Sequence, residues 1–226
     1  MKSLLSEWKI QKFVLVWLAY WLSVMGFKIF VMKPMGFTFL DNVEYVIAYF
    51  VFFGVFGHFL LRSMGEMAPI RNYKMQIPVT LASGIIFAFI SIGMRGYLPI
   101  TPENELYIKN LGFLYPLLTT GTVLGKYADI FFQQTLILSL VLFLKQNCKR
   151  PREVVEIFTF VFFILHVPLF LEFGILALIF IIPSLFAGAI FSFLITFYSW
   201  GVLGSMLVHQ YYYIAMAIIL RLLFRG

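Results

Sequence analysis

The sequence predicts an all-α membrane protein, a polytopic transmembrane helical bundle of seven to eight spans that forms one integral membrane domain over residues 1–226. Hydrophobic residues make up 62% of the chain and charged residues only 12%, whereas soluble domains carry about 25% charged residues. Mean hydropathy is +0.95. Long apolar runs alternate with short segments that hold most of the charge, as expected of a chain that crosses a bilayer repeatedly.

The first half of the chain contains three apolar runs. Residues 1–12 are basic and are expected to form a short interfacial helix on the cytoplasmic side. Spans are then expected from about Phe13 to Met32, from Val43 to Leu61 and from Val79 to Met94. Four prolines in the intervening segments are interpreted as loop breakers, namely Pro69, Pro78, Pro99 and Pro102.

The second half begins with a long apolar run over residues 111–144, interrupted by Lys126 and Asp129. This run is compatible with two helices, or with a re-entrant segment followed by one helix. A basic loop at 145–152 contains Cys148, the one cysteine, which therefore has no partner for an internal disulfide. A span over 154–171 follows, and residues 173–220, which carry no Asp, Glu, Lys or Arg, have room for two more spans.

The net charge of +7 comes from basic residues in loops and termini. This distribution favours contact with anionic headgroups of membrane lipids and argues against a nucleic-acid partner. The loops at 62–74 and 145–152 and both termini are all basic, so the positive-inside rule does not fix the orientation from sequence alone.

Three histidines, His58, His166 and His209, fall inside predicted spans, where ionisable residues are costly and often functional. For His58 the favoured interpretation is structural, a neutral imidazole bonded to a carbonyl or hydroxyl of a neighbouring helix. His166 and His209 are favoured as site residues. Gln133 and His166 lie at matched depth, each roughly 18–21 Å from the basic loop at about 1.5 Å per helical residue.

A polar group precedes the basic loop on the same predicted helix. Asp129 and Gln133 are four residues apart and share a face, whereas Gln134 points about 100° away. A buried acid needs a proton or a partner, and Lys126, one turn before Asp129, is the candidate partner. The alternative role for this group is hydrogen bonding between helices.

Two short motifs follow in order. Phe162 and His166 form a Phe-x-x-x-His motif, and His209 begins a later motif of the form His-x-x-x-Tyr that ends at Tyr213. Together with Gln133 and Gln134, these two motifs resemble those of the CAAX protease and bacteriocin-processing family of intramembrane enzymes, also called the Abi family. That family carries Phe-x-x-x-His and then His-x-x-x-Asn or Asp, and the resemblance covers residues 111–224.

The first motif of the family, Glu-Glu-x-x-x-Arg, is degenerate in this chain. Gln133 and Gln134 stand at the two glutamate positions, and Leu138 stands at the arginine position. In the family a glutamate and a histidine are thought to activate the attacking water, but a glutamine amide cannot serve as a base near neutral pH. The resemblance therefore implies a protein of the prokaryotic cell membrane, impaired in proteolysis.

The resulting hypothesis is a protease-like protein that binds a hydrophobic or lipidated peptide or a membrane protein partner, as a scaffold or immunity factor. It requires neither a cofactor nor a metal. The residues at catalytic positions are His166 and His209, with Gln133 and Gln134 as vestigial partners. The residues expected to line the cavity are Asp129, Gln133, Phe162 and Tyr213.

Two alternatives remain open from the sequence. One is an active membrane endopeptidase or metal-dependent enzyme that uses Asp129, His166 and His209, since a carboxylate can replace the missing base and neutral imidazole is a common metal ligand. The other is a bis-histidine haem protein or a solute transporter.

Overall fold

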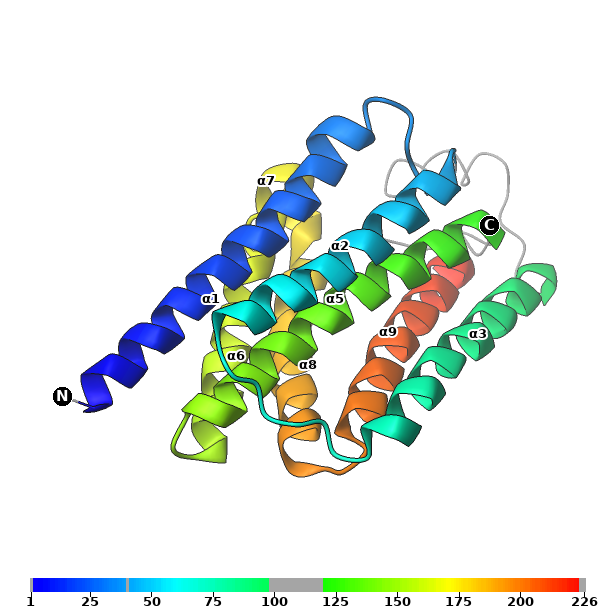
Figure 1. The fold of residues 1–226 in the computed structure, drawn as a ribbon. Helices are drawn as coiled ribbons and strands as arrows, with labels where there is room; N and C mark the ends of the chain where they lie inside the picture. The colour runs from blue at the N-terminus through cyan, green and yellow to red at the C-terminus, as the bar shows by residue number, and fades with distance from the viewer. Residues whose placement is uncertain (1, 40, 98–119, 224–226) are drawn as a thin grey trace.

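The structure, a computed structural model, describes residues 2–39, 41–97 and 120–223, and every regular element within them is a helix (Figure 1). The all-α prediction is confirmed. Seven helical segments of the described chain are long and apolar enough to cross a membrane. The elements are α1 (Lys2–Phe27), the π-helix η1 (Lys28–Met32), α2 (Val43–Met64), α3 (Tyr73–Tyr97), α5 (Thr120–Asn147), α6 (Pro151–His166), α7 (Leu169–Phe173), the 3₁₀-helix η2 (Gly174–Ala177), α8 (Leu178–Phe197) and α9 (Gly201–Leu223).

Helix α5 is the central element of the bundle. Of its most apolar 18-residue stretch, 83% is buried, compared with 22% to 39% for the other six spans. It contacts α1, α2, α3, α6, α8 and α9. A helix shielded from lipid in this way can carry polar side chains, because they find partners in the protein. This explains why the run with Lys126 and Asp129 is the one placed at the centre.

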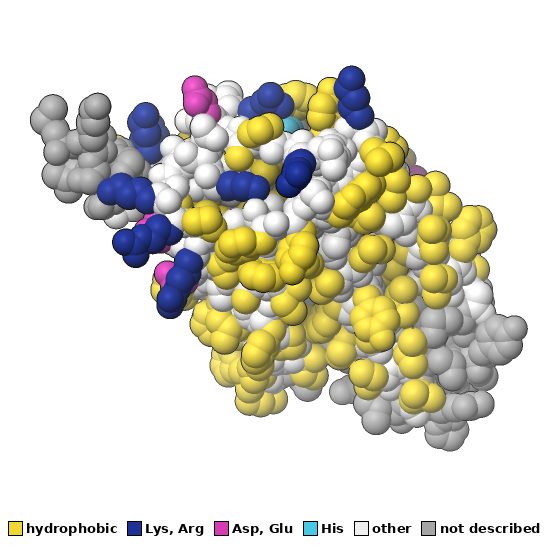
Figure 2. Space-filling view, turned by 90° about the horizontal axis from the view of Figure 1, so that it is seen from below, with side chains coloured by type: hydrophobic (Ala, Val, Ile, Leu, Met, Phe, Trp, Pro, Cys, Tyr) yellow, Lys and Arg dark blue, Asp and Glu magenta, His cyan; other side chains and the backbone are white. Residues whose placement is uncertain are grey.

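The basic segments gather at one end of the bundle. The start of α1, the α2–α3 connection and the α5–α6 connection all lie there, and Figure 2 shows Lys and Arg side chains clustered on this face. The described residues in this basic end face are Lys9, Lys12, Arg62, Arg71, Lys74, Lys145, Lys149, Arg150 and Arg152. The positive-inside rule favours a face of this composition for the cytoplasmic side, and only the helix arrangement brings these basic segments together.

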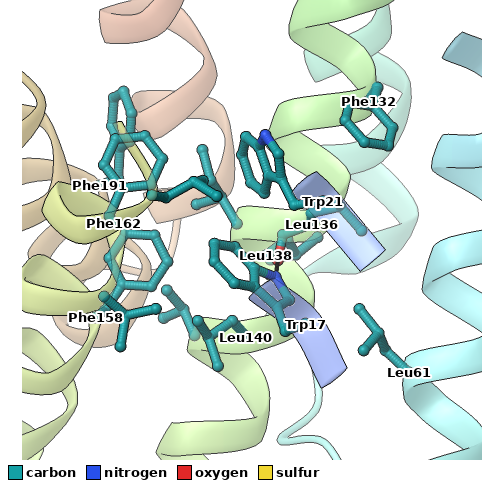
Figure 3. Close-up of a cluster of buried hydrophobic side chains, with 14 of the residues drawn as sticks. Trp17, Trp21, Leu61, Phe132, Leu136, Leu138, Leu140, Phe158, Phe162 and Phe191 are labelled. Atoms are coloured by element: carbon teal, nitrogen blue, oxygen red, sulfur yellow. Dashed lines mark hydrogen bonds between the residues drawn. The ribbon is translucent and has the colours of Figure 1, made fainter. Parts of the chain in front are cut away.

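The core lies where α1 crosses α5. Trp17 is fully buried and its indole N–H donates to the Leu136 carbonyl at 2.8 Å. Figure 3 shows Trp17 and Trp21 set among side chains of α5 and α6; the rings of Trp21 and Phe132 are 5.8 Å apart and those of Trp21 and Phe162 6.1 Å apart. Because the Trp17 donor is satisfied inside the core, a large aromatic residue can be buried there at no hydrogen-bond cost.

Several predicted boundaries were wrong. Helix α3 begins at Tyr73, so Pro78 lies inside a helix and is not a loop breaker. Pro78 lacks the N–H that would bond the Lys74 carbonyl, but Lys74 is exposed in the first turn of the helix, where water can replace that bond. Residues 2–12 continue into the first span as one helix. Pro69 does lie in a connection, and Pro99 and Pro102 fall outside the described residues.

The basic loop is also shorter than predicted. Helix α5 continues to Asn147 and α6 begins at Pro151, which occupies the first helical turn, where its missing N–H costs nothing. The Glu153 carboxylate accepts hydrogen bonds from the backbone N–H groups of Lys149 and Arg150, at 3.1 and 3.3 Å. This capping stabilises a sharp reversal between two spans. Within residues 111–144, the described part from Thr120 is one continuous helix.

Candidate functional site

Two adjoining cavities lie beside α5, the first between α5, α6, α8 and α9 and the second between α1, η1, α5, α6 and α7. The first, here called the site cavity, has a volume of about 300 Å³ and is largely apolar. Its polar lining residues are Gln133, His166, Ser184, His209, Tyr212 and Tyr213. The second, the side cavity, has a volume of about 590 Å³ and extends toward α1 and α7. The two cavities share the lining residues Gln133, His166, Phe180 and Tyr213.

The structure brings together residues that are far apart in the sequence. Gln133 on α5, His166 on α6 and His209 on α9 all line the site cavity, as do Phe162 and Tyr213. Asp129 lines the side cavity. Gln134 lines neither of the two, because it points toward α9. The catalytic or vestigial roles assigned to these residues from sequence stay predictions.

Lys126, Asp129 and Gln133 form a hydrogen-bonded row along one face of α5. The Lys126 ammonium donates to one Asp129 carboxylate oxygen at 2.6 Å, and the Gln133 amide donates to the other at 2.9 Å. Lys126 also lies 4.0 Å from the centre of the Tyr213 ring. The prediction that Lys126 is the partner of Asp129 is confirmed. Since both side chains are only 2% exposed, the pair is a buried, charge-balanced unit.

His166 is held by its own helix. Its Nδ1 lies 2.7 Å from the Phe162 carbonyl oxygen, four residues earlier, and the two rings are 4.6 Å apart. A backbone carbonyl only accepts hydrogen bonds, so Nδ1 carries the proton. In the neutral imidazole the other ring nitrogen, Nε2, then has a free lone pair.

His209 is positioned by Gln134. The amide of Gln134 donates to Ser205 Oγ at 2.5 Å, and its oxygen lies 3.4 Å from His209 Nδ1. Gln134 therefore links α5 to α9 and orients the imidazole, which is hydrogen bonding between helices of the kind expected for an amide in a membrane. A row of ring contacts continues from Phe191 through His209 to Tyr213, with centroid separations of 5.2 and 5.6 Å.

His58 has the structural role predicted for it. Its Nδ1 lies 3.0 Å from the hydroxyl oxygen of Ser139, across the contact between α2 and α5. Ser139 itself donates to the Thr135 carbonyl at 2.8 Å, so its oxygen accepts the proton of the His58 ring. His58 lines neither cavity.

One contributor to the site was missed in the sequence, namely Tyr212. Pro183 lies inside α8 and lacks the N–H that would bond the Ile179 carbonyl four residues before it. The Tyr212 hydroxyl donates to that carbonyl at 3.0 Å and so joins α9 to α8 beside the site cavity. A proline within an apolar run signals such a free carbonyl, but the sequence does not show which side chain will bind it.

No group of three or more His, Cys, Asp or Glu side chains within residues 2–39, 41–97 and 120–223 is placed to hold one metal ion. The site geometry is thus that of a small apolar cavity with two oriented imidazoles, a glutamine and a neutralised ion pair beside it. Comparisons of the chain with protein-family models, with curated proteins and with solved structures found no match.

Proposed function

We propose that this multi-pass membrane protein, which resembles the CAAX protease and Abi family in its motifs, binds a hydrophobic or lipidated peptide in the site cavity without hydrolysing it. The proposal rests on the Asp129 carboxylate, whose two oxygens are both occupied by hydrogen bonds. Asp129 is the one acidic residue among the described residues that line either cavity, and its oxygens are engaged by Lys126 and by Gln133.

A general base must be able to accept a proton from the attacking water. Asp129 is neutralised by Lys126 at 2.6 Å, and the amides at positions 133 and 134 have no basic lone pair near neutral pH. Loss of a general base typically lowers a rate by about 10²–10⁴. The arrangement argues against Asp129 as a substitute base. His166 Nε2 keeps a lone pair that can accept a proton, but among the described residues it has no carboxylate partner, so the arrangement supports retained binding and impaired hydrolysis.

The lining suits the apolar part of an amphiphile. Ile182, Phe186 and Ile190 of α8 line the site cavity and are themselves exposed on the surface of the helix. Phe30 and Leu171 do the same for the side cavity. Because these surfaces face lipid in a membrane, a prenyl or acyl chain can enter from the bilayer, and the few polar groups inside then fix its orientation.

Photo-crosslinking tests this proposal. The purified protein in nanodiscs is irradiated with a farnesylated peptide that carries a benzophenone, and the adduct is mapped by mass spectrometry. Adducts are expected on α6, α8 and α9, with the peptide bonds of the probe intact. Ala187→Trp, which fills the site cavity, should abolish them, whereas Ala82→Trp, on the exposed face of α3, should not.

Two results would contradict the proposal. Absence of adducts at the cavity would remove the binding role. Cleavage of the probe that disappears in His166→Ala, or on addition of a chelator, would instead establish an active or metal-dependent enzyme.

A further inference from the structure

The junction of the two cavities is formed in part by Gln133 and His166, which line both of them. The orientation of each side chain is determined by its partner. Gln133 donates its amide N–H to Asp129 Oδ1, and the Lys126 ammonium pairs with Oδ2 of the same carboxylate. The Gln133 oxygen is therefore left for another group. His166 donates from Nδ1 to the Phe162 carbonyl, which leaves the lone pair of Nε2.

The described part of the chain gives no hydrogen-bond partner to Gln133 Oε1 or to His166 Nε2. Two hydroxyl groups of the site cavity are already donating. Ser184 donates to the Ile181 carbonyl at 2.7 Å, and Tyr212 donates to the Ile179 carbonyl at 3.0 Å. Gln133 keeps a second amide N–H, so donors are not absent. The distinctive feature of the junction is two oriented acceptors that face both cavities.

The charges around the junction limit which ligand groups can bind there. The ion pair of Lys126 and Asp129 is neutral as a unit, so a bound cation would find no free carboxylate. A phosphate or carboxylate would meet the two lone pairs. A neutral group that donates a hydrogen bond needs no counter-charge and is not repelled by the lone pairs. In apolar surroundings the donor and both acceptors gain a hydrogen-bond partner that lipid cannot supply.

We propose that the junction binds an amide N–H of the lipidated peptide, received by His166 Nε2 and Gln133 Oε1. This inference rests on the proposed function and adds to it a preference: of two ligands with the same lipid chain, the one that ends in a primary amide binds more tightly than the one that ends in an ester or a carboxylate.

A matched series of probes tests the preference. S-farnesyl-3-mercaptopropionic acid, which carries no other N–H, is prepared as its primary amide, its methyl ester and its free carboxylate. Each compound competes with the photo-crosslinking probe for the protein in nanodiscs. The amide is expected to compete about tenfold more tightly than the methyl ester, the factor for one hydrogen bond of about 1.4 kcal/mol.

Variants assign the effect to the junction. His166→Phe keeps an aromatic ring but removes Nε2, so it should still bind the farnesyl chain while the amide-to-ester ratio falls to about one. Gln133→Met is the second such variant. His58→Phe is the matched control, because it removes a histidine of another helix pair that lines neither cavity, and it should keep the ratio.

The outcomes separate this inference from the proposed function. Equal competition by all three compounds, or tightest competition by the carboxylate, overturns the donor preference and leaves binding in place. A preference that survives in both His166→Phe and Gln133→Met also overturns it. Failure of every compound to compete would remove the proposed binding itself.

Discussion

Replacement of Lys126 by methionine is expected to destabilise the protein strongly. Methionine fills a similar volume but removes the charge, and so leaves the Asp129 carboxylate buried with only the Gln133 amide as partner. Removing one partner of a buried ion pair costs about 3–5 kcal/mol. At about 2–4 °C per kcal/mol for a chain of this size, the melting temperature should fall by roughly 6–20 °C.

The exposed pair Arg152–Glu156 provides a matched control. Its nitrogen–oxygen distance is also 2.6 Å, but its side chains are 87% and 56% exposed. Arg152→Met should therefore cost less than about 1 kcal/mol. Thermal unfolding of the purified variants in mild detergent, followed by tryptophan fluorescence, measures both effects under one condition.

A double variant identifies the cause of the loss. Lys126→Met combined with Asp129→Asn removes the stranded charge and keeps an acceptor for Gln133, so it should recover most of the lost stability. If the double variant is as unstable as Lys126→Met, the loss comes from packing against Tyr213 and not from charge. If Lys126→Met is as mild as Arg152→Met, the carboxylate is not desolvated as the structure indicates, and the reasoning is refuted.

Three other predictions concern stability and reactivity. Gln76→Met should lower the stability by several kcal/mol, because the Gln76 amide makes four hydrogen bonds to backbone groups. Gln210→Met should cost much less, because Gln210 Nε2 is buried without a partner among the described residues and its oxygen accepts one bond, from Ser83 at 3.2 Å. Equal losses in thermal unfolding would contradict this. Gly201→Ala should be strongly destabilising, because its methyl group would lie 2.0 Å from a backbone oxygen, and Gly93→Ala, with open space around it, should be neutral or stabilising by up to about 1 kcal/mol in the same assay. Burial, together with a nearby carboxylate, raises the pKa of the Cys148 thiol to about 11. Alkylation of Cys148 should therefore be roughly 100-fold slower at pH 7.5 in the folded protein than in the SDS-unfolded chain, and its rate should rise tenfold per pH unit up to pH 10. Fast labelling of the folded protein at neutral pH would refute this.

The fold class follows from sequence because lipid imposes a local rule. Each span must satisfy its own backbone hydrogen bonds as a helix, and the apolar runs are long enough to do so. Helix boundaries were less predictable. Pro78 looked like a loop residue, yet near the start of a helix its missing N–H can be compensated by water. The cap at Glu153, which shortens the basic loop, depends on only a few residues and is hard to separate from a run of charges.

Parts of the site were also predictable. The spacing of Lys126, Asp129 and Gln133 places them on one helical face whatever the surroundings, so their hydrogen bonds follow from sequence. The role of His58 was also anticipated, but not the identity of its partner, Ser139, which lies 81 residues away. A contact over such a separation depends on which helix faces meet.

The sequence by itself determined that this protein lies in a membrane, that its spans are helical and that a few polar residues are buried within them, because each of these properties depends on composition and periodicity within one segment. Only the tertiary structure decided that α5 is the central helix, that the basic segments share one end, and that Gln133, His166 and His209 line one cavity. Lipid is as apolar as the helix surfaces, so burial alone does not select which helices meet. That selection comes from close packing and from specific hydrogen bonds, such as those of Trp17 to Leu136, and these exist only once the helices are together.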